Sequence, residues 1–242
     1  MDSASGRTGN LLLDSVPRDA SDRLLNGIAP STLEQDDVVQ PPTAPIENVL
    51  FPTAGVASVL TLVLNQANHG ARSVEAVTVG REGMTNIHAA LGVTMSGPET
   101  TVIQVDGKAF VVPIRRVIEE MDRRGAFADV VHRYVQAFWA QTAYGSACNA
   151  VHHVTTRCAR WLLQTHDRVD GDRFYLTQEY LGNMLGSERS TVSVAASELQ
   201  RRGLIEYSRG NVTIVDRQAL ESVACECYER IRAEQYRLAP MD

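Results

Sequence analysis

The sequence predicts an α+β protein with a β-rich N-terminal domain, a long central helix and a C-terminal winged helix-turn-helix domain. Short apolar runs separated by turn residues extend from Leu33 to Val112, which is typical of a β-sandwich or barrel. The apolar period becomes helical from Pro113 to about Thr165, and Leu176–Asp216 then reads as two short helices followed by two strands. With 242 residues, the chain has room for two compact domains.

The composition predicts a soluble, cytoplasmic protein without a membrane segment. No apolar run approaches the ~18 residues that a membrane helix needs, and the polar start MDSASGRTGN is unlike a secretory signal. The net charge of −6 and the pI near 5.5 argue against indiscriminate nucleic-acid binding. A local basic face suffices for specific recognition, and its candidates are Arg201, Arg202 and Arg209.

An N-terminal segment, residues 1–23, precedes the β-rich domain, which we expect over residues 24–125. Met1–Asn10 is rich in Ser and Gly and is expected to be disordered. The apolar residues at Leu11–Leu13 and Leu24–Leu25 predict one or two short helices. The β-rich domain should contain strands at Asn48–Phe51, Val56–Leu64, Val74–Val79, Thr101–Val105 and Ala109–Val112.

Arg81 and Glu82 lie between two glycines of this domain. We expect an exposed ion pair on a turn, because such pairs are common and weak, and the alternative is an ion pair in a ligand pocket.

Residues 126–150 are predicted to form one long helix. Its apolar stripe at helical spacing consists of Val130, Val131, Tyr134, Val135, Phe138 and Thr142. A further helix, Val151–Thr165, opens the C-terminal domain, residues 151–242, and Asp167–Arg173 is a loop.

Two short helices joined by a glycine are expected next. Thr177 is the candidate N-cap of the first, which Gly186 ends after about Leu185. Ser187 is the candidate cap of the second, whose apolar face consists of Val192, Ala195, Ala196 and Leu199. Gly203 ends this second helix.

Two strands, Leu204–Tyr207 and Asn211–Val215, then form a hairpin wing around Arg209-Gly210. Two helices with exposed polar residues near the start of the second, followed by a wing, are the arrangement that inserts a helix into the DNA major groove.

The segments LTQEYLGNMLG, SERSTVSVAASELQRRGLI and YSRGNVTIVD resemble the winged helix-turn-helix of the CRP/FNR superfamily of bacterial transcription regulators. VTVGREGM and CECY resemble a less-studied branch of it. The resemblance, which extends from about Leu24 to Tyr228, implies that the β-rich domain is a jelly roll of the cyclic-nucleotide-binding type. It also implies that the helix 126–150 pairs two chains into a homodimer, and that double-stranded DNA, RNA polymerase and an unknown small-molecule effector are partners. The alternative is that this helix packs within a monomer.

In cyclic-nucleotide-binding relatives, a Gly-Glu pair and a downstream Arg hold the ribose and the phosphate. Glu82 is present here, but Pro98–Gln104 contains no Arg. A buried phosphate without a cation is strongly unfavourable, so we expect no cyclic-nucleotide dependence and no cofactor.

The resemblance also assigns the residues that contact DNA. Arg189 occupies the position of a base-reading Arg, whereas Ser190 replaces the usual Glu and Val194 replaces a second Arg. Base contacts are therefore expected from Arg189, Ser190, Ser193 and Val194, and phosphate contacts from Thr177, Thr191, Arg202 and Arg209. Because the Glu–Arg pair is absent, the operator should differ from the family's usual half-sites.

The four cysteines, Cys148, Cys158, Cys225 and Cys227, should be reduced in a cytoplasmic chain. Arg217–Arg232 is predicted to be one helix with Asp216 as its N-cap, on which the thiols of a Cys-X-Cys pair point roughly 200° apart. We therefore expect the cysteines to pack or cap a helix rather than to sense redox state or metal, and we expect no metal site.

The sequence contains no nucleotide-binding glycine loop, no Gly-X-Ser-X-Gly elbow and no His-Glu-X-X-His motif, so we expect no enzymatic activity. The expected function is a homodimeric regulator that binds an inverted repeat. The alternative is an interaction or scaffold protein whose winged helix has lost DNA binding.

Overall fold

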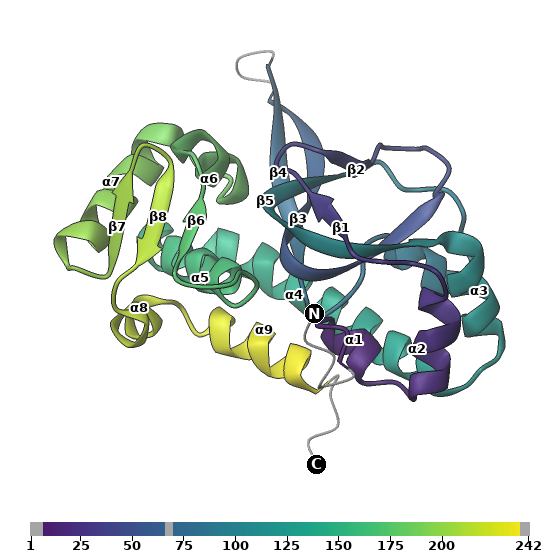
Figure 1. Cartoon of the computed structure of the whole chain (residues 1–242). Coiled ribbons are helices and arrows are strands. Elements are labelled where there is room, and N and C mark those ends of the chain that lie inside the picture. The colour runs from purple at the N-terminus through teal and green to yellow at the C-terminus, as the bar shows by residue number, and fades with distance from the viewer. Residues whose placement is uncertain (1–6, 66–69, 238–242) are drawn as a thin grey trace.

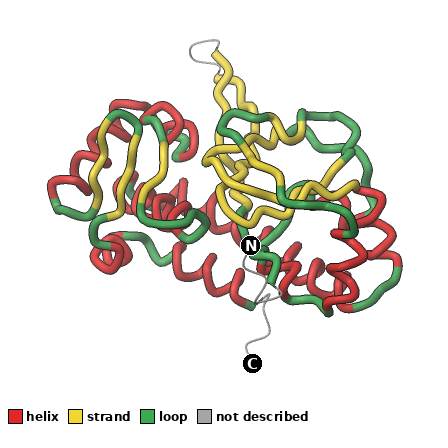
Figure 2. The backbone as a smooth tube through the Cα atoms, viewed as in Figure 1, coloured by secondary structure: helices red, strands yellow, loops and turns green. Residues whose placement is uncertain are grey.

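The computed structural model describes residues 7–65 and 70–237, and its elements form two regions joined by a long helix (Figure 1). Antiparallel strands and short helices make up the N-terminal region, and a compact helical region with a small sheet makes up the C-terminal one (Figure 2). The fold class is therefore α+β, as predicted. Within the described residues, no helix is both long enough and apolar enough to cross a membrane.

The N-terminal segment packs onto the first region through two helices, α1 (Leu11–Asp14) and α2 (Arg18–Leu25). Asn10 is fully buried: its side chain caps α1 and donates hydrogen bonds to the carbonyls of Pro52 and Gly83, each at 2.8 Å. The prediction of disorder up to Asn10 is therefore wrong for this residue, because its amide provides buried backbone groups with partners. Residues 1–6 lie outside the described part of the chain.

The first region, here called the β domain, is built around one antiparallel sheet. Its strands are β1 (Ser31–Leu33), β2 (Val38–Gln40), β3 (Asn48–Asn65), β4 (Gly70–Val79) and β5 (Thr100–Pro113). The strand order is β1-β5-β3-β4, and β2 also pairs with β5. Register shifts between Pro52 and Ala57 bend β3, so two runs that we expected as separate strands are one continuous strand. A 3-10 helix, η1 (Ile87–Leu91), follows β4.

Two helices follow the sheet: α3 (Ile114–Asp122) and the long α4 (Ala126–Val151). The apolar stripe of α4 faces its own chain, since Val130, Val131 and Tyr134 are buried in one cluster with residues of the β domain. The stripe that predicted the helix is therefore a core face and not the face available to a second chain.

The C-terminal region, here called the winged-helix domain, extends from α5 to α8. Its elements are α5 (Val154–His166), β6 (Arg173–Tyr175), α6 (Gln178–Met184), α7 (Arg189–Arg201), β7 (Ile205–Ser208), β8 (Asn211–Ile214) and α8 (Arg217–Val223). A last helix, α9 (Cys227–Tyr236), packs along α4 (Figure 1). The predicted single helix Arg217–Arg232 is wrong, because the chain becomes extended at Ala224, with φ −62° and ψ 151°, and begins a new helix at Cys227.

Candidate nucleic-acid interface

The helix-turn-helix consists of α6, a short turn and α7. The side chain of Thr177 accepts a hydrogen bond from the backbone N–H of Tyr180 at 3.2 Å, as predicted for the N-cap of α6. Gly186 has φ +56°, a left-handed conformation that suits glycine, and it turns the chain away from α6. These two residues therefore mark the start of α6 and the turn that leads to α7.

Helix α7 has one buried face and one exposed face. Val192, Ala195, Ala196 and Leu199 are buried, as predicted, and hold the helix against α5. Arg189, Ser190, Thr191 and Val194 are exposed, and Ser193 is half-buried at the border. The first two turns of α7 therefore present one cation, three hydroxyls and one apolar side chain, Val194, which is 68% exposed.

The prediction that Ser187 caps α7 is wrong. Glu188 is the N-cap, without a side-chain capping hydrogen bond. The hydroxyl of Ser187 instead donates to the carbonyl of Leu185 at 3.1 Å and accepts a hydrogen bond from Arg157 at 2.9 Å. Ser187 thus ties the turn to α5, because its hydroxyl bonds inward and not along α7.

The wing follows α7 within one residue of the predicted bounds. β7 and β8 pair through Ser208 and Asn211, so that Arg209 and Gly210 form a two-residue loop. Both loop residues have positive φ, 50° and 83°, as a type I′ turn requires. Arg209 is exposed at the tip. Arg202, at the end of α7, is also exposed and lies 4.0 Å from Glu198.

A third strand, β6, pairs with β8, and its first residue, Arg173, is the last residue of the loop that we expected at Asp167–Arg173. It brings Arg173 and Tyr175, both exposed, beside the wing, and Arg173 donates to the side chain of Asn211 at 3.3 Å. Its three residues, Arg-Phe-Tyr, are exposed, buried and exposed in turn, as alternate residues of a strand are. In the sequence, the corresponding signal is one apolar residue, Phe174, between two residues with polar ends. The candidate interface therefore includes a cation that the sequence analysis missed.

Two arginines from outside the helix-turn-helix hold its turn. Arg157 in α5 donates to the carbonyl of Leu185 at 3.1 Å as well as to Ser187. Arg72 in β4 donates to the carbonyls of Gly182 and Ser187. Burial lowers the pKa of Arg157. The start of α7 is therefore positioned by both regions of the molecule.

The junction of the two regions contains a buried ion pair. Glu82 and Arg168 are only 7% and 3% exposed, and their side chains lie 2.7 Å apart. Arg81 pairs with the exposed Asp170 at 2.7 Å. The expected surface pair between Arg81 and Glu82 is wrong, and so is its pocket alternative, because each residue binds a partner from the loop after α5.

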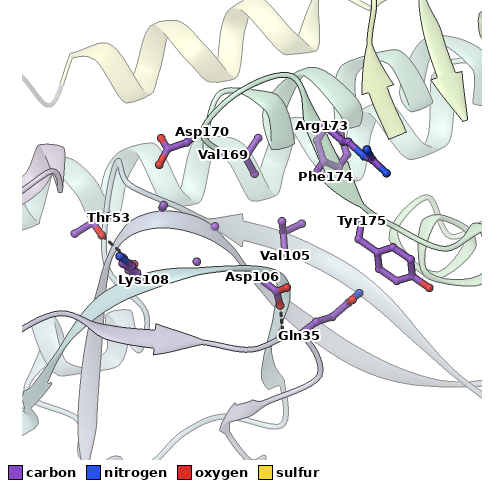
Figure 3. Close-up of a pocket in the computed structure, with 13 residues that line it drawn as sticks. Gln35, Thr53, Val105, Asp106, Lys108, Val169, Asp170, Arg173, Phe174 and Tyr175 are labelled. Carbon is purple, nitrogen blue, oxygen red and sulfur yellow. Dashed lines mark hydrogen bonds between the residues drawn. The ribbon is translucent and has the colours of Figure 1, made fainter. Parts of the chain in front are cut away.

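A cavity of about 510 Å³ lies between the β domain and β6 (Figure 3). Lys108 and Asp106 extend from one side, and Asp170, Arg173 and Tyr175 from the other. Asp106 accepts a hydrogen bond from the backbone N–H of Gln35 at 2.7 Å, drawn as a dashed line in Figure 3. The charges in this cavity are mixed.

A second cavity, of about 190 Å³, lies within the β domain beside α4. Apolar side chains such as Val59, Val77 and Phe138 line it, together with His88 and Glu99, whose side chains are 3.1 Å apart. No Arg or Lys occurs among the described residues that line it. The cavity therefore offers no permanent positive charge to a bound molecule.

The geometry defines a winged helix-turn-helix protein with an N-terminal β domain and a long connecting helix. Residues 156–223 match the family model of the Crp-like helix-turn-helix domain. A CRP/FNR-family protein from Eubacterium rectale aligns with 90% of this chain and 99% of its own, with a TM-score of 0.61 and 16% identity. FixK2 from Bradyrhizobium japonicum aligns with 82% of this chain and 98% of its own, with a TM-score of 0.57 and 16% identity.

A CRP-family transcriptional regulator from Thermus thermophilus aligns with 80% of this chain and 96% of its own, with a TM-score of 0.57 and 17% identity. No curated protein matches the sequence. The family model thus identifies residues 156–223 as a Crp-like helix-turn-helix domain, and the fold of the whole chain is similar to that of these CRP/FNR-family structures.

Proposed function

We propose that the chain is a sequence-specific DNA-binding transcription regulator that acts as a homodimer on an inverted repeat. The observation that carries the proposal is the exposed start of α7, where Arg189, Ser190 and Thr191 lie opposite the buried face of the helix. A helix anchored by one face and polar at its exposed N-terminal end fits the major groove. The wing, with Arg209 at its tip, suits the adjacent phosphates.

Each exposed side chain of α7 suits a particular contact. Arg189 can form two hydrogen bonds to O6 and N7 of a guanine, and the hydroxyls of Ser190 and Ser193 can bond to base edges. Val194 suits contact with a thymine methyl group, since its side chain is apolar and exposed. Specificity would therefore rest on one cation and several short side chains.

Phosphate contacts are assigned to residues at the edges of the interface. Arg202 and Arg209 supply positive charge, and Thr191 supplies a hydroxyl. The oxygen of Thr177 accepts a hydrogen bond from the backbone, so its own hydrogen remains available to a phosphate. Arg173 adds a cation beside the wing.

The exposed face of α4 supports pairing of two chains. Trp139 is 73% exposed, and Ala143, Ser146 and Ala150 are exposed on the same face at intervals of four, three and four residues. Such a heptad-like spacing of one large and several small residues suits a close helix pair. A symmetric pair would present two α7 helices to the half-sites of an inverted repeat, where RNA polymerase would be a further partner.

The charge of the β-domain cavity supports independence from cyclic nucleotides. Glu99 lies in it and no Arg or Lys lines it in the described part of the chain. A buried phosphate without a cation is costly, so an effector bound there would be neutral or cationic. The effector is therefore of a different chemical class from a cyclic nucleotide.

Selection of duplexes from a random pool, followed by titration of the enriched duplex at several salt concentrations, tests the proposal. We expect an enriched inverted repeat, bound by two chains, with an affinity that falls steeply as salt increases because phosphate contacts release counterions. Arg115→Ala, which removes an exposed arginine on α3, should leave binding unchanged. A chain that remains monomeric and ignores duplexes at low ionic strength would instead support a scaffold protein.

A further inference from the structure

Three cysteines and a histidine meet where α9 packs against the end of α4. Cys148 and His152 come from the end of α4, and Cys225 and Cys227 come from the junction between α8 and α9. The Sγ atoms of the cysteines and one ring nitrogen of the histidine all lie within 4.8 Å of one another. The Sγ atoms of Cys148 and Cys225 are 3.4 Å apart, and Sγ of Cys227 is 3.7 Å from Nδ1 of His152.

Local backbone structure brings these four side chains together. Cys148 and His152 are four residues apart, so they share one face at the end of α4. Cys225 and Cys227 reach the same point because the chain leaves the helical conformation at Ala224 and resumes it at Cys227. The prediction that these two thiols diverge along one helix is wrong for this reason.

The spacing suits one metal ion and not a larger cluster. Zinc binds sulfur at about 2.3 Å, and a tetrahedron with that bond length has edges of about 3.8 Å. The two measured separations, 3.4 and 3.7 Å, lie close to that edge. An iron–sulfur cluster would spread its cysteines farther apart, because metal and sulfide atoms would lie between them.

The histidine is oriented as a metal ligand by a neighbouring carboxylate. Nδ1 of His152 faces the sulfur atoms, and Nε2 lies 3.3 Å from a carboxylate oxygen of Glu226. A hydrogen bond from Nε2–H to that oxygen leaves the lone pair on Nδ1 free for a metal. Ligand histidines in proteins are commonly held by such a carboxylate.

The four donor side chains are shielded from solvent and lie near a buried cation. All three cysteines are buried, and His152 is half-buried, so that bulk water has little access to the donors. The guanidinium of Arg160 lies near enough to Cys148 and Cys225 to attract negative charge on their sulfur atoms. Three thiolates and a divalent ion leave one negative charge, which the buried cation Arg160 offsets.

We propose that Cys148, His152, Cys225 and Cys227 bind a single zinc ion in a closed tetrahedral site. A site with four protein ligands and no open position is structural, since no coordination position is left for a substrate. The ion fastens the end of α4 to the α8–α9 junction, across the boundary between the long helix and the winged-helix domain. The site does not depend on the DNA-binding proposal, because its evidence comes from other residues.

Metal analysis of the full chain tests the proposal directly. The protein is purified under reducing conditions without chelator, and its zinc content is measured by mass spectrometry. We expect about one zinc ion per chain, as one four-ligand site requires. Cobalt(II) exchanged into the site should show the intense visible bands of tetrahedral coordination and sulfur-to-cobalt charge transfer.

Paired variants distinguish a ligand from a residue that only supports folding. His152→Ala should weaken zinc binding by more than about tenfold, because even the loss of an outer-shell partner costs that much. His152→Cys, which restores four donors, should retain stoichiometric zinc and shift the cobalt charge-transfer band. His153→Asn, at the neighbouring histidine that caps α5, should retain wild-type binding.

Three results would overturn the proposal. The first is a folded, reduced chain without stoichiometric zinc, whose cobalt form shows only the weak bands of octahedral coordination. The second is a disulfide between Cys148 and Cys225 in protein prepared under reducing conditions, detected by a mass two hydrogens lower. Unchanged zinc content in a folded Cys225→Ser, Cys227→Ser double variant would overturn it equally.

Discussion

Arg168 donates hydrogen bonds to both carboxylate oxygens of Glu82, at 3.1 Å from Nε to each and 2.7 Å from the second guanidinium nitrogen to Oε1. The two residues belong to different regions of the molecule, and both are buried. Gly80 makes room for this contact, since a Cβ there would lie 2.3 Å from the Arg168 side chain. The pair therefore fixes the loop after α5 against the β domain.

Glu82→Gln should lower the free energy of unfolding by about 3–5 kcal/mol, because it leaves a buried guanidinium without its counter-charge. Denaturant titration measures this change. Asp170→Asn is the matched control: it removes the charge of an 80% exposed partner of Arg81 and should cost about 0–1 kcal/mol. Equal effects of the two substitutions would contradict the assignment of Glu82.

Arg189→Ala should reduce discrimination at one base pair of the operator by about 1–3 kcal/mol, because it removes the bidentate donor to guanine. Binding-site selection with the variant and the wild type measures the change at each position. Dimerisation should persist, since Arg189 belongs to α7 whereas the face proposed for pairing belongs to α4. Unchanged selectivity would show that α7 does not read bases through this residue.

Arg157→Gln should loosen the turn before α7, because it removes the donors to Leu185 and Ser187. Hydrogen bonds from a charged group contribute about 1.5–3 kcal/mol. The free energy that opens the turn should therefore fall by about that amount in the variant. Hydrogen exchange of the amides in residues 182–189 measures it. Arg201→Gln, at an exposed arginine near the end of α7, should leave exchange in the turn unchanged.

The contribution of Glu75 to the free energy of unfolding should fall as the pH rises above about 4.5. Burial raises the pKa of this carboxyl group, whose oxygens bond to Trp161 at 2.9 Å and to Ser58 at 2.8 Å. The folded state therefore binds the proton more tightly than the unfolded state, so this contribution is complete below the unfolded pKa and disappears as pH passes through the folded pKa.

Glu75→Gln removes this dependence while it retains an acceptor for the indole of Trp161. Thermal unfolding from pH 4 to pH 8 measures the slope, and each unit of pKa difference corresponds to about 1.4 kcal/mol. An identical pH profile for the variant and the wild type would contradict the role of Glu75.

Removal of the proposed zinc ion should lower the melting temperature. A site occupied at about 1,000 times its Kd stabilises the folded state by about 4 kcal/mol, which corresponds to roughly 10 °C for a chain of this size. Unfolding with and without a strong chelator measures the shift. Cys225→Ser should show no chelator effect, whereas Cys158→Ala, which removes a buried thiol outside the site, should retain it.

The helix-turn-helix was predictable because its pattern is local. The Thr177 cap, the glycine at 186 and the apolar spacing from Val192 to Leu199 each involve neighbours within one or two turns. The two-residue turn of the wing is equally local. Here the sequence analysis and the structure differ by about one residue at element ends.

Contacts between distant segments were not predictable from the pattern. Arg168 and Glu82 are 86 residues apart in sequence, and neither alone indicates a partner. The apolar stripe of α4 identified a helix, but periodicity cannot show whether such a face meets its own chain or another. The break at Ala224 was hidden because the flanking residues suit a helix, and packing of α9 along α4 overrides that preference.

Of the two tryptophans in the chain, Trp139 projects from α4 into solvent, whereas Trp161 is 1% exposed. Burial of an indole shifts its fluorescence to shorter wavelength, so association through α4 would change the emission of one ring and spare the other. The emission of Trp139 therefore reports self-association through α4 without an added dye or tag.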